Sequence, residues 1–349
     1  MSALLLTELR LPQPYLLFLG NVTEAPYAKT AFGLRDWVPE QCVGEFALPE
    51  AAITTGLPRL TPSQAYARGA RALVIGVAPI GGAIDRAWVP GLLEALDAGL
   101  DVISGMHARL QETPELKTAA ERLGRRLINV REAPAHLPIG NGRKRSGKRL
   151  LTVGTDCALG KKYTALAITR AFKARGLKAD FRATGQTGIL IAGAGIPIDA
   201  VVSDFVAGAA EMLSPDAADD HWDVVEGQGS LFHPSYAGVS LGLLHGTQPD
   251  VIVLCHEAGR EHMLGLPEFA LPSLQEAIDL NLKLTRRTNP AARCAGVSLN
   301  TSKLRELEAR VLMAKESARL NVPVADPVRG GFEFDALVEA CLTSWLPNS

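Results

Sequence analysis

The sequence has few cysteines, no long apolar run and no excess of charge of either sign. Its five cysteines are widely spaced, odd in number and without the paired spacing of a zinc site, which excludes a disulfide scaffold and indicates reduced thiols in a cytoplasmic protein. No apolar run reaches the ~18 residues of a membrane span. Glu8 and Arg10 interrupt the leucine-rich start of the chain, so we expect no signal peptide and no membrane contact.

The formal net charge is only −1, which gives no overall field that would attract nucleic acid. We therefore expect small-molecule partners and no nucleic acid. At 349 residues, with 47% hydrophobic and 21% charged residues, the chain is globular and too long for one ordinary core, so two domains are expected.

The most irregular stretch lies between residues 134 and 149 and separates two halves of different pattern. It combines turn formers with a basic cluster, which cannot support a core element. The basic residues are Arg143, Lys144, Arg145, Lys148 and Arg149. We interpret the cluster as a solvated linker, with a second phosphate contact as the alternative. The expected organisation is a domain at 1–138, a linker at 139–148 and a domain at 149–349.

In both halves, short apolar runs alternate with stretches of helical periodicity. This alternation predicts an α/β fold with parallel sheets. The predicted strands are 15–19, 72–75, 101–104, 127–130, 149–153, 179–183, 222–225, 250–254 and 294–298. The predicted helices are 88–98, 114–123, 161–175, 204–213, 274–288, 303–319 and 334–345.

The most informative residues lie between the predicted strand 149–153 and the predicted helix that begins at 161. They are Gly154, Thr155, Asp156, Cys157, Ala158, Leu159, Gly160, Lys161, Lys162 and Tyr163. A strand, a glycine-containing loop and a helix that begins with Gly-Lys predict a phosphate cradle, because backbone N–H groups and the helix N-terminus converge on one anion. The alternative is a strand-turn-helix corner whose glycines serve the backbone alone.

This loop differs from the common P-loop in two ways. Five residues separate Gly154 from Gly160 instead of four, although four separate Thr155 from Gly160. The hydroxyl residue that normally follows the lysine and holds Mg²⁺ is here Lys162. We therefore expect the loop to bind a phosphate without hydrolysing a nucleotide, and we predict no metal site.

A second motif, Val224-Val225-Glu226-Gly227-Gln228-Gly229, places an acid at the carboxyl end of a predicted strand. In a sheet that carries a phosphate loop, such a carboxylate faces the phosphates, where it can hold a cation or accept a substrate proton. The alternative is that Glu226 only pairs with Lys161 or Lys162.

Together with Ser298-Leu299-Asn300, these two motifs resemble dethiobiotin synthetase and related P-loop proteins. The resemblance implies that Glu226 helps to hold Mg²⁺ and that Asn300 reads the adenine of ATP, in an Mg-ATP-dependent ligase or kinase. It covers only the second half of the chain and fails at Lys162.

A closer resemblance spans nearly the whole chain, through the segments 27–34, 154–164, 204–211 and 226–234. These segments resemble a bacterial family that was long catalogued as a domain of unknown function and includes D-glutamate N-acetyltransferases. The resemblance implies an N-terminal Rossmann-like domain, a C-terminal P-loop NTPase-like domain, acetyl-CoA as the donor and a D-amino acid as the acceptor. The phosphates of coenzyme A could occupy the loop without Mg²⁺.

Acetyl transfer needs a base for the substrate ammonium and a donor for the tetrahedral oxyanion. By their positions near strand ends, Glu226, His233 and His256 are the candidates for the base, although a loop histidine such as His233 is usually a surface residue. These alternatives stay open, as does a third class of function, a nucleotide-binding regulatory module without chemistry.

A glutamate-like acceptor requires cations for its carboxylates, and arginine is the best suited. Arg260 and Arg329 lie in loops after late strands, and Lys29 could contribute from the first domain. Asp204 begins a predicted helix, where it is either an N-cap or a contact to a substrate or cation. Since exposed faces of such sheets often pair, we also expect a homo-oligomer.

Overall fold

The computed structural model describes residues 11–77 and 82–343, which form two compact units. The first unit extends to Ala133 and also contains Gly185–Pro197, a segment from the second half of the sequence. The second unit contains Pro134–Thr184 and the chain from Ile198 onward. Our expected domain boundaries place Gly185–Pro197 in the second domain, whereas in the structure this segment belongs to the first unit. Among the described residues there is no helix with the length and apolarity needed to cross a membrane.

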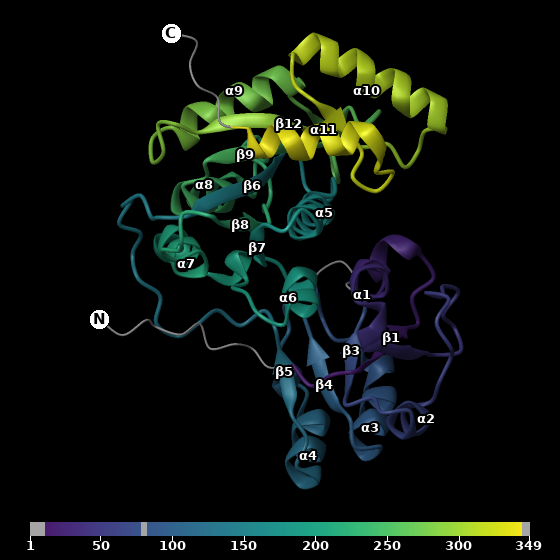
Figure 1. Ribbon diagram of the computed structural model, residues 1–349. Helices are drawn as coiled ribbons and strands as arrows, with labels where there is room; N and C mark the ends of the chain where they lie inside the picture. The colour runs from purple at the N-terminus through teal and green to yellow at the C-terminus, as the bar shows by residue number, and fades with distance from the viewer. Residues whose placement is uncertain (1–10, 78–81, 344–349) are drawn as a thin grey trace. The chain divides into compact units, whose positions relative to one another are not determined.

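The first unit is built on a five-stranded parallel sheet in the order β2-β1-β3-β4-β5. Strands β1, β3, β4 and β5 are labelled in Figure 1. Its elements are β1 (Tyr15–Gly20), α1 (Lys29–Trp37), β2 (Cys42–Ala47), α2 (Pro62–Ala67), β3 (Ala72–Ile75), α3 (Val89–Asp97), β4 (Asp101–Ser104), α4 (Pro114–Leu123) and β5 (Leu127–Asn129). Buried side chains such as Phe18 and Trp88, with ring centroids 5.9 Å apart, form its core. This architecture confirms the predicted α/β class for the first half.

Helix α6 (Gln186–Ala192) packs beside α1 in this first unit (Figure 1). The hydroxyls of Thr30 and Thr187 lie 3.0 Å apart across the contact. A Cβ on Gly105 would lie 2.0 Å from the side-chain amide of Gln186, so the close approach of α6 requires glycine at that position. The chain returns at Ile198, whose N–H donates to the carbonyl of Thr184 at 3.0 Å.

The second unit contains a six-stranded parallel sheet in the order β13-β12-β9-β6-β8-β7. Its strands are β6 (Lys148–Gly154), β7 (Lys178–Arg182), β8 (His221–Val225), β9 (Val251–Glu257), β12 (Arg293–Asn300) and β13 (Val324–Ala325), with an antiparallel hairpin of β10 (His262–Met263) and β11 (Leu266–Ala270). Its helices are α5 (Lys161–Ala174), α7 (Val206–Leu213), α8 (Ala237–Thr247), α9 (Leu274–Thr285), α10 (Glu306–Leu320) and α11 (Gly331–Leu342). The carboxyl ends of β6, β8, β9 and β12 therefore meet at one edge of this sheet.

Each predicted strand is present, and each predicted helix is present within the described residues. The strands β2, β10, β11 and β13 and the helices α1, α2, α6 and α8 were not predicted. The reason is clearest for α8, which contains Gly238, Gly242 and Gly246 and therefore has a weak local signal for a helix. A Cβ on Gly242 would lie 2.6 Å from Val206, and one on Gly246 would lie 2.1 Å from the carbonyl of Ala207. Tight packing against α7, which is not visible in local sequence, requires glycine at positions 242 and 246.

The interpretation of the basic cluster as a solvated linker is wrong for two of its arginines. Arg145 and Arg149 are 6% and 1% exposed, and their guanidinium groups donate mainly to backbone carbonyls. Arg145 bonds to Gly246 O at 2.9 Å near the end of α8, and Arg149 bonds to Pro215 O at 2.7 Å beyond α7. Helix C-termini present unsatisfied carbonyls and a partial negative charge, so buried guanidinium groups suit these positions.

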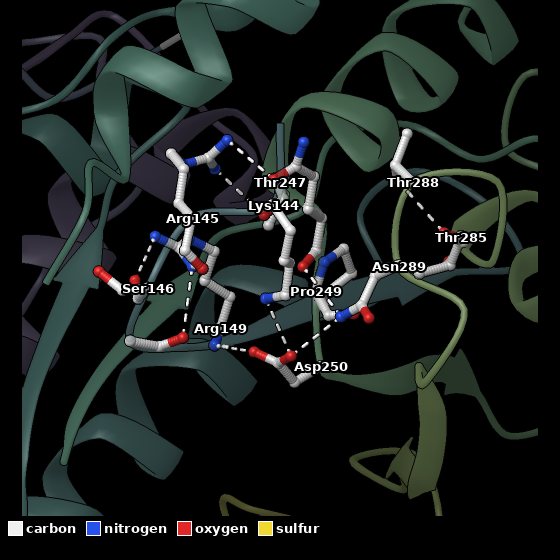
Figure 2. A network of polar contacts seen from close by, with 12 residues as sticks. Lys144, Arg145, Ser146, Arg149, Thr247, Pro249, Asp250, Thr285, Thr288 and Asn289 are labelled. Carbon is white, nitrogen blue, oxygen red and sulfur yellow. Dashed lines mark hydrogen bonds and ion pairs between the residues drawn. The ribbon is translucent and has the colours of Figure 1, made fainter. Parts of the chain in front are cut away.

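Asp250 completes this network at the amino edge of the sheet (Figure 2). Its carboxylate accepts from the backbone N–H of Arg149 at 2.8 Å and from Asn289 Nδ2 at 2.9 Å, and it lies 3.0 Å from the Lys144 ammonium. The basic cluster thus joins the start of β6 to the start of β9.

Candidate functional site

The predicted phosphate loop lies at the carboxyl edge of the second sheet, between β6 and α5. Ala158 and Gly160 adopt positive φ angles of 55° and 110°, which turn the backbone sharply before the helix begins at Lys161. The N–H of Thr155 donates to the carbonyl of Cys255 at 3.2 Å and ties the loop to β9. This geometry directs the N-terminus of a 14-residue helix toward the loop, as an anion site requires.

Lys161 lies inside the loop, with only 7% of its surface exposed. Its ammonium donates to the carbonyl of Asp156 at 2.7 Å. Burial lowers the pKa of Lys161 below its usual value, although nearby negative charges, including those of Asp156 and Glu226, act in the opposite direction. A bound phosphate would add negative charge beside the ammonium and favour its charged form.

The residues after Lys161 depart from a magnesium-binding arrangement. Lys162 holds its ammonium 4.9 Å from the centre of the Tyr163 ring. The next aliphatic hydroxyl belongs to Thr164, which is buried, donates to Gly160 O at 3.1 Å and lies 2.7 Å from the hydroxyl of Ser298 on β12. The loop therefore presents a second positive charge where a common P-loop presents a metal-binding hydroxyl.

Arg260, predicted to bind substrate, is bonded to the phosphate loop. It donates to Asp156 Oδ2 at 3.0 Å and to Cys157 O at 2.9 Å, and it forms an ion pair with Glu257. Burial raises the pKa of the Glu257 carboxyl, but its contacts with Lys303 and Arg260 outweigh this effect, so the pKa is lowered. In this geometry Arg260 braces the loop against β9.

His233 approaches the same loop from the segment after β8. Its Nδ1 accepts from the N–H of Ser235 at 3.1 Å, which places the proton of a neutral ring on Nε2. Nε2 lies 4.0 Å from Asp156 Oδ1, a buried oxygen without a hydrogen-bond partner among the described residues. The ligand atoms of Asp156, Cys157 and His233 lie within 4.8 Å of one another. A protonated Nε2 is a donor, so this arrangement disfavours His233 as a base or a metal ligand.

Glu226 is buried one residue beyond β8. Its Oε2 accepts from the N–H of Thr184 at 3.0 Å, at the end of β7. The next residue requires glycine, because a Cβ on Gly227 would lie 1.6 Å from Thr152 O and 3.1 Å from Lys161 Cδ. The glycine motif thus allows β8 to approach β6 and the lysine closely, and it positions a fixed carboxylate near the loop.

His256 lies in β9 on the other side of the loop. Its Nδ1 is 2.8 Å from the hydroxyl of Thr155. Burial, and then the positive charge of Arg260, lower the pKa of His256 from its usual value of 6.5, so the ring is neutral at physiological pH. The imidazole also lines an open cavity of about 610 Å³.

The remaining predicted site residues are Asn300, Arg329, Asp204 and Lys29. Asn300 ends β12, and its Oδ1 accepts from Ser302 N at 3.1 Å. Arg329 donates to Thr301 Oγ1 and to Leu304 O, both at 2.6 Å, and so holds the loop that precedes α10. Asp204 is exposed in a short 3-10 turn and provides no side-chain cap to α7. Lys29 is exposed at the start of α1 in the first unit.

The structure therefore brings the phosphate loop, Glu226, His233, His256 and Arg260 together in the second unit. Sequence reasoning missed Thr184, which bonds to Glu226, and the cavity that His256 lines. A polar residue directly after a predicted strand was a usable signal for Thr184. The cavity depends on how α9 and α10 pack, which no local pattern encodes.

Comparison with known proteins agrees with this architecture. Residues 42–133 match a family model described as the DUF1611_N Rossmann-like domain, and residues 138–338 match the DUF1611_C P-loop domain. A protein named D-glutamate N-acetyltransferase from Tritonibacter scottomollicae is 50% identical over 318 residues, which cover 91% of this chain and 96% of that protein. One of the same name from Pseudoalteromonas sp. is 44% identical, covering 93% and 98%. The crystal structure of a DUF1611 family protein from Anabaena variabilis superposes with a TM-score of 0.84 at 33% identity, covering 95% of this chain and 99% of that one.

Proposed function

This chain belongs to the DUF1611 family and has two relatives that are named D-glutamate N-acetyltransferase, and from that premise we propose that it transfers an acetyl group from acetyl-CoA to the amino group of a D-amino acid such as D-glutamate. It is an acyltransferase with a Rossmann-like domain and a P-loop domain.

One observation carries the choice of donor: the phosphate loop has a buried lysine and a second lysine in place of the magnesium-binding hydroxyl. Coenzyme A contains a pyrophosphate, which needs positive charge and backbone N–H groups to bind but no metal-assisted phosphoryl transfer. Lys161 and the N-terminus of α5 would hold the pyrophosphate, and Lys162 would add charge at its edge. An ATP-dependent ligase or kinase would instead need Mg²⁺ at this loop.

The acyl transfer step requires removal of a proton from the acceptor ammonium. The free amine then attacks the thioester carbon and a tetrahedral oxyanion forms; the attacking nitrogen loses its second proton, the carbonyl reforms as the C–S bond breaks, and the departing thiolate takes up one proton to leave as the thiol of coenzyme A. We assign the removal of the ammonium proton to Glu226. Its buried carboxylate accepts a hydrogen bond from Thr184 N, and Glu226 lies between the end of β8 and Gly227.

The length of the donor constrains this assignment. About a dozen single bonds separate the pyrophosphate from the sulfur, so an extended pantetheine arm reaches on the order of 15 Å from the loop. The arm must therefore fold back over the end of β8 for the thioester to meet Glu226.

The test is release of coenzyme A thiol from acetyl-CoA upon addition of D-glutamate, with EDTA present throughout. The proposal expects D-glutamate-dependent release in EDTA, formation of the N-acetylated product and slower reaction with L-glutamate. Thiol release that occurs without an acceptor, or turnover of ATP that depends on Mg²⁺, would contradict it. A purely regulatory module would bind ligand and release no thiol.

A further inference from the structure

A cavity of about 610 Å³ lies in the second unit beside the phosphate loop. It is formed at the ends of β9 and β12, at the start of α9 and along one face of α10. Its walls combine four leucines, at positions 271, 274, 299 and 312, with charged side chains of both signs, such as Arg260 and Glu316. A volume of this size and a mostly apolar wall are typical of a site for a small organic molecule.

Two contacts connect this cavity to the phosphate loop. His256 lines the cavity and lies 2.8 Å from the hydroxyl of Thr155 through its Nδ1. Arg260 also lines the cavity and donates to the carbonyl of Cys157 at 2.9 Å. A ligand whose phosphate occupies the loop would therefore place the group next to that phosphate at the entrance of the cavity.

The chemistry of coenzyme A determines which group that is. The ribose is attached directly to the pyrophosphate, whereas the thioester lies about a dozen bonds away on the other side. A planar adenine ring gains free energy when it is buried between aliphatic side chains. The neutral imidazole of His256 can form hydrogen bonds with ribose hydroxyls.

Arg319 supplies the positive charge that the 3′-phosphate of coenzyme A would need. Its Nε and Nη2 donate to Glu316 Oε2 at 2.9 and 2.6 Å, which fixes the orientation of the guanidinium, and its side chain is 45% exposed. Both residues line the cavity. A fixed guanidinium with further donors on Nη1 is well suited to a phosphate.

We propose that this cavity binds the 3′-phosphoadenosine end of the acyl donor, with Leu299 and Leu312 against the adenine and Arg319 bonded to the 3′-phosphate. The inference rests on the proposed function, because it takes coenzyme A as the ligand of the phosphate loop. It gives His256 a role in binding the nucleoside, and it separates that end of the donor from Glu226 on β8.

The test compares coenzyme A with dephospho-coenzyme A, which lacks only the 3′-phosphate, by calorimetry. Wild-type protein is expected to bind coenzyme A ~10–100-fold more tightly, as a charge-assisted bidentate contact implies. Arg319→Gln is expected to remove this preference and to leave the affinity for dephospho-coenzyme A within about twofold. Arg310→Gln is the matched control, since Arg310 forms an exposed pair with Glu306 on the same helix.

A second pair of variants tests the cavity itself. Leu312→Trp fills it and is expected to weaken both ligands at least tenfold, whereas Val311→Trp changes an adjacent, exposed residue of α10 and should weaken neither. Equal wild-type affinities for the two ligands, or a preference that survives in Arg319→Gln, would overturn the inference while D-glutamate-dependent thiol release still supports the proposed function. Failure of wild-type protein to bind coenzyme A at all would overturn both.

Discussion

The two edges of the second sheet each bury positive charge, but they use it in opposite ways. At the amino edge, the guanidinium of Arg149 bonds to several oxygens of the protein, including Ser146 O, Pro215 O and Ser214 Oγ. At the carboxyl edge, the ammonium of Lys161 makes one hydrogen bond within the described residues, to Asp156 O. A buried cation surrounded by protein acceptors stabilises the fold, and one with few such partners is available to an anionic ligand.

The difference follows from the geometry of a parallel α/β sheet. Loops at the amino edge only connect helices to strands, so the C-termini of α7 and α8 can be closed by arginine without harm to function. The carboxyl edge must leave N–H groups and charge available for ligands, which lowers the stability of that edge in the free protein. Substitutions at the two edges should therefore separate stability from activity.

The largest expected effect is at the carboxyl edge. Glu226→Gln should slow D-glutamate-dependent thiol release by ~10²–10⁴, because the amide cannot accept a proton. The bond from Thr184 N persists to the amide oxygen, so the free energy of unfolding and the affinity for acetyl-CoA should stay near wild type. Steady-state kinetics as a function of pH provide the measurement. An acidic limb that persists unchanged in the variant would remove Glu226 from the proton transfer.

At the amino edge, Arg149→Met should lower the free energy of unfolding by about 3–5 kcal/mol, since it leaves several buried carbonyls without a donor. Urea unfolding measures this, and the folded variant should bind acetyl-CoA as wild type does. Arg143→Gln removes an exposed pair with Asp216 in the same cluster and should change stability by at most about 1 kcal/mol. Comparable losses of unfolding free energy in Arg149→Met and Arg143→Gln would contradict the stabilising role of the buried network.

Lys161→Met should change ligand affinity and not stability, which is the opposite of the effect expected for Arg149→Met. It should weaken acetyl-CoA binding by ~1.5–3 kcal/mol, because it removes a charge-assisted phosphate contact. The free energy of unfolding should not decrease, because a desolvated charge is replaced by an apolar chain of similar length. Lys173→Met, at the exposed end of the same helix, is the control for both measurements. A large loss of stability with unchanged affinity would show that Lys161 behaves like the arginines of the amino edge.

The smallest effect concerns the pH dependence of stability. Burial lowers the pKa of His256 below its usual 6.5, so the unfolded chain binds a proton there more readily than the folded protein does. Its contribution to stability is complete above 6.5 and is lost as the pH falls from 6.5 toward the lower folded-state pKa. His256→Asn should reduce the decline in unfolding free energy over that window, while the exposed His262→Asn should not. Identical slopes for wild type and His256→Asn would contradict the burial of this imidazole.

Nine of the strands, the phosphate loop and the position of Glu226 could be predicted because each depends on a local pattern, whereas β2, β10, β11 and β13 were missed. Apolar runs mark buried strands, and Gly160-Lys161 after a strand marks a helix that begins at an anion site. Features that depend on packing could not be predicted. Gly242 and Gly246 weaken the helical signal of α8 because they serve the contact with α7, and the charge of Arg145 suggests solvent although its partners are carbonyls distant in sequence.

The candidate site also combines features that the sequence predicts with features that depend on packing. The sequence identifies Glu226 and His256 by their places near strand ends, which parallel topology brings together. It cannot tell that the N–H of Ser235 occupies one nitrogen of His233, or that Arg260 and Arg329 bond to protein groups. Hydrogen-bond partners of this kind depend on loop conformations that have no periodic signature.

The most direct test of the central claim is calorimetry of acetyl-CoA and of ATP with the wild-type protein, each with Mg²⁺ and with EDTA. If the carboxyl-edge loop is a metal-independent site for coenzyme A, acetyl-CoA should bind with the same affinity in Mg²⁺ and in EDTA, and more tightly than ATP in both. ATP that binds more tightly than acetyl-CoA, and only with Mg²⁺, would contradict the account.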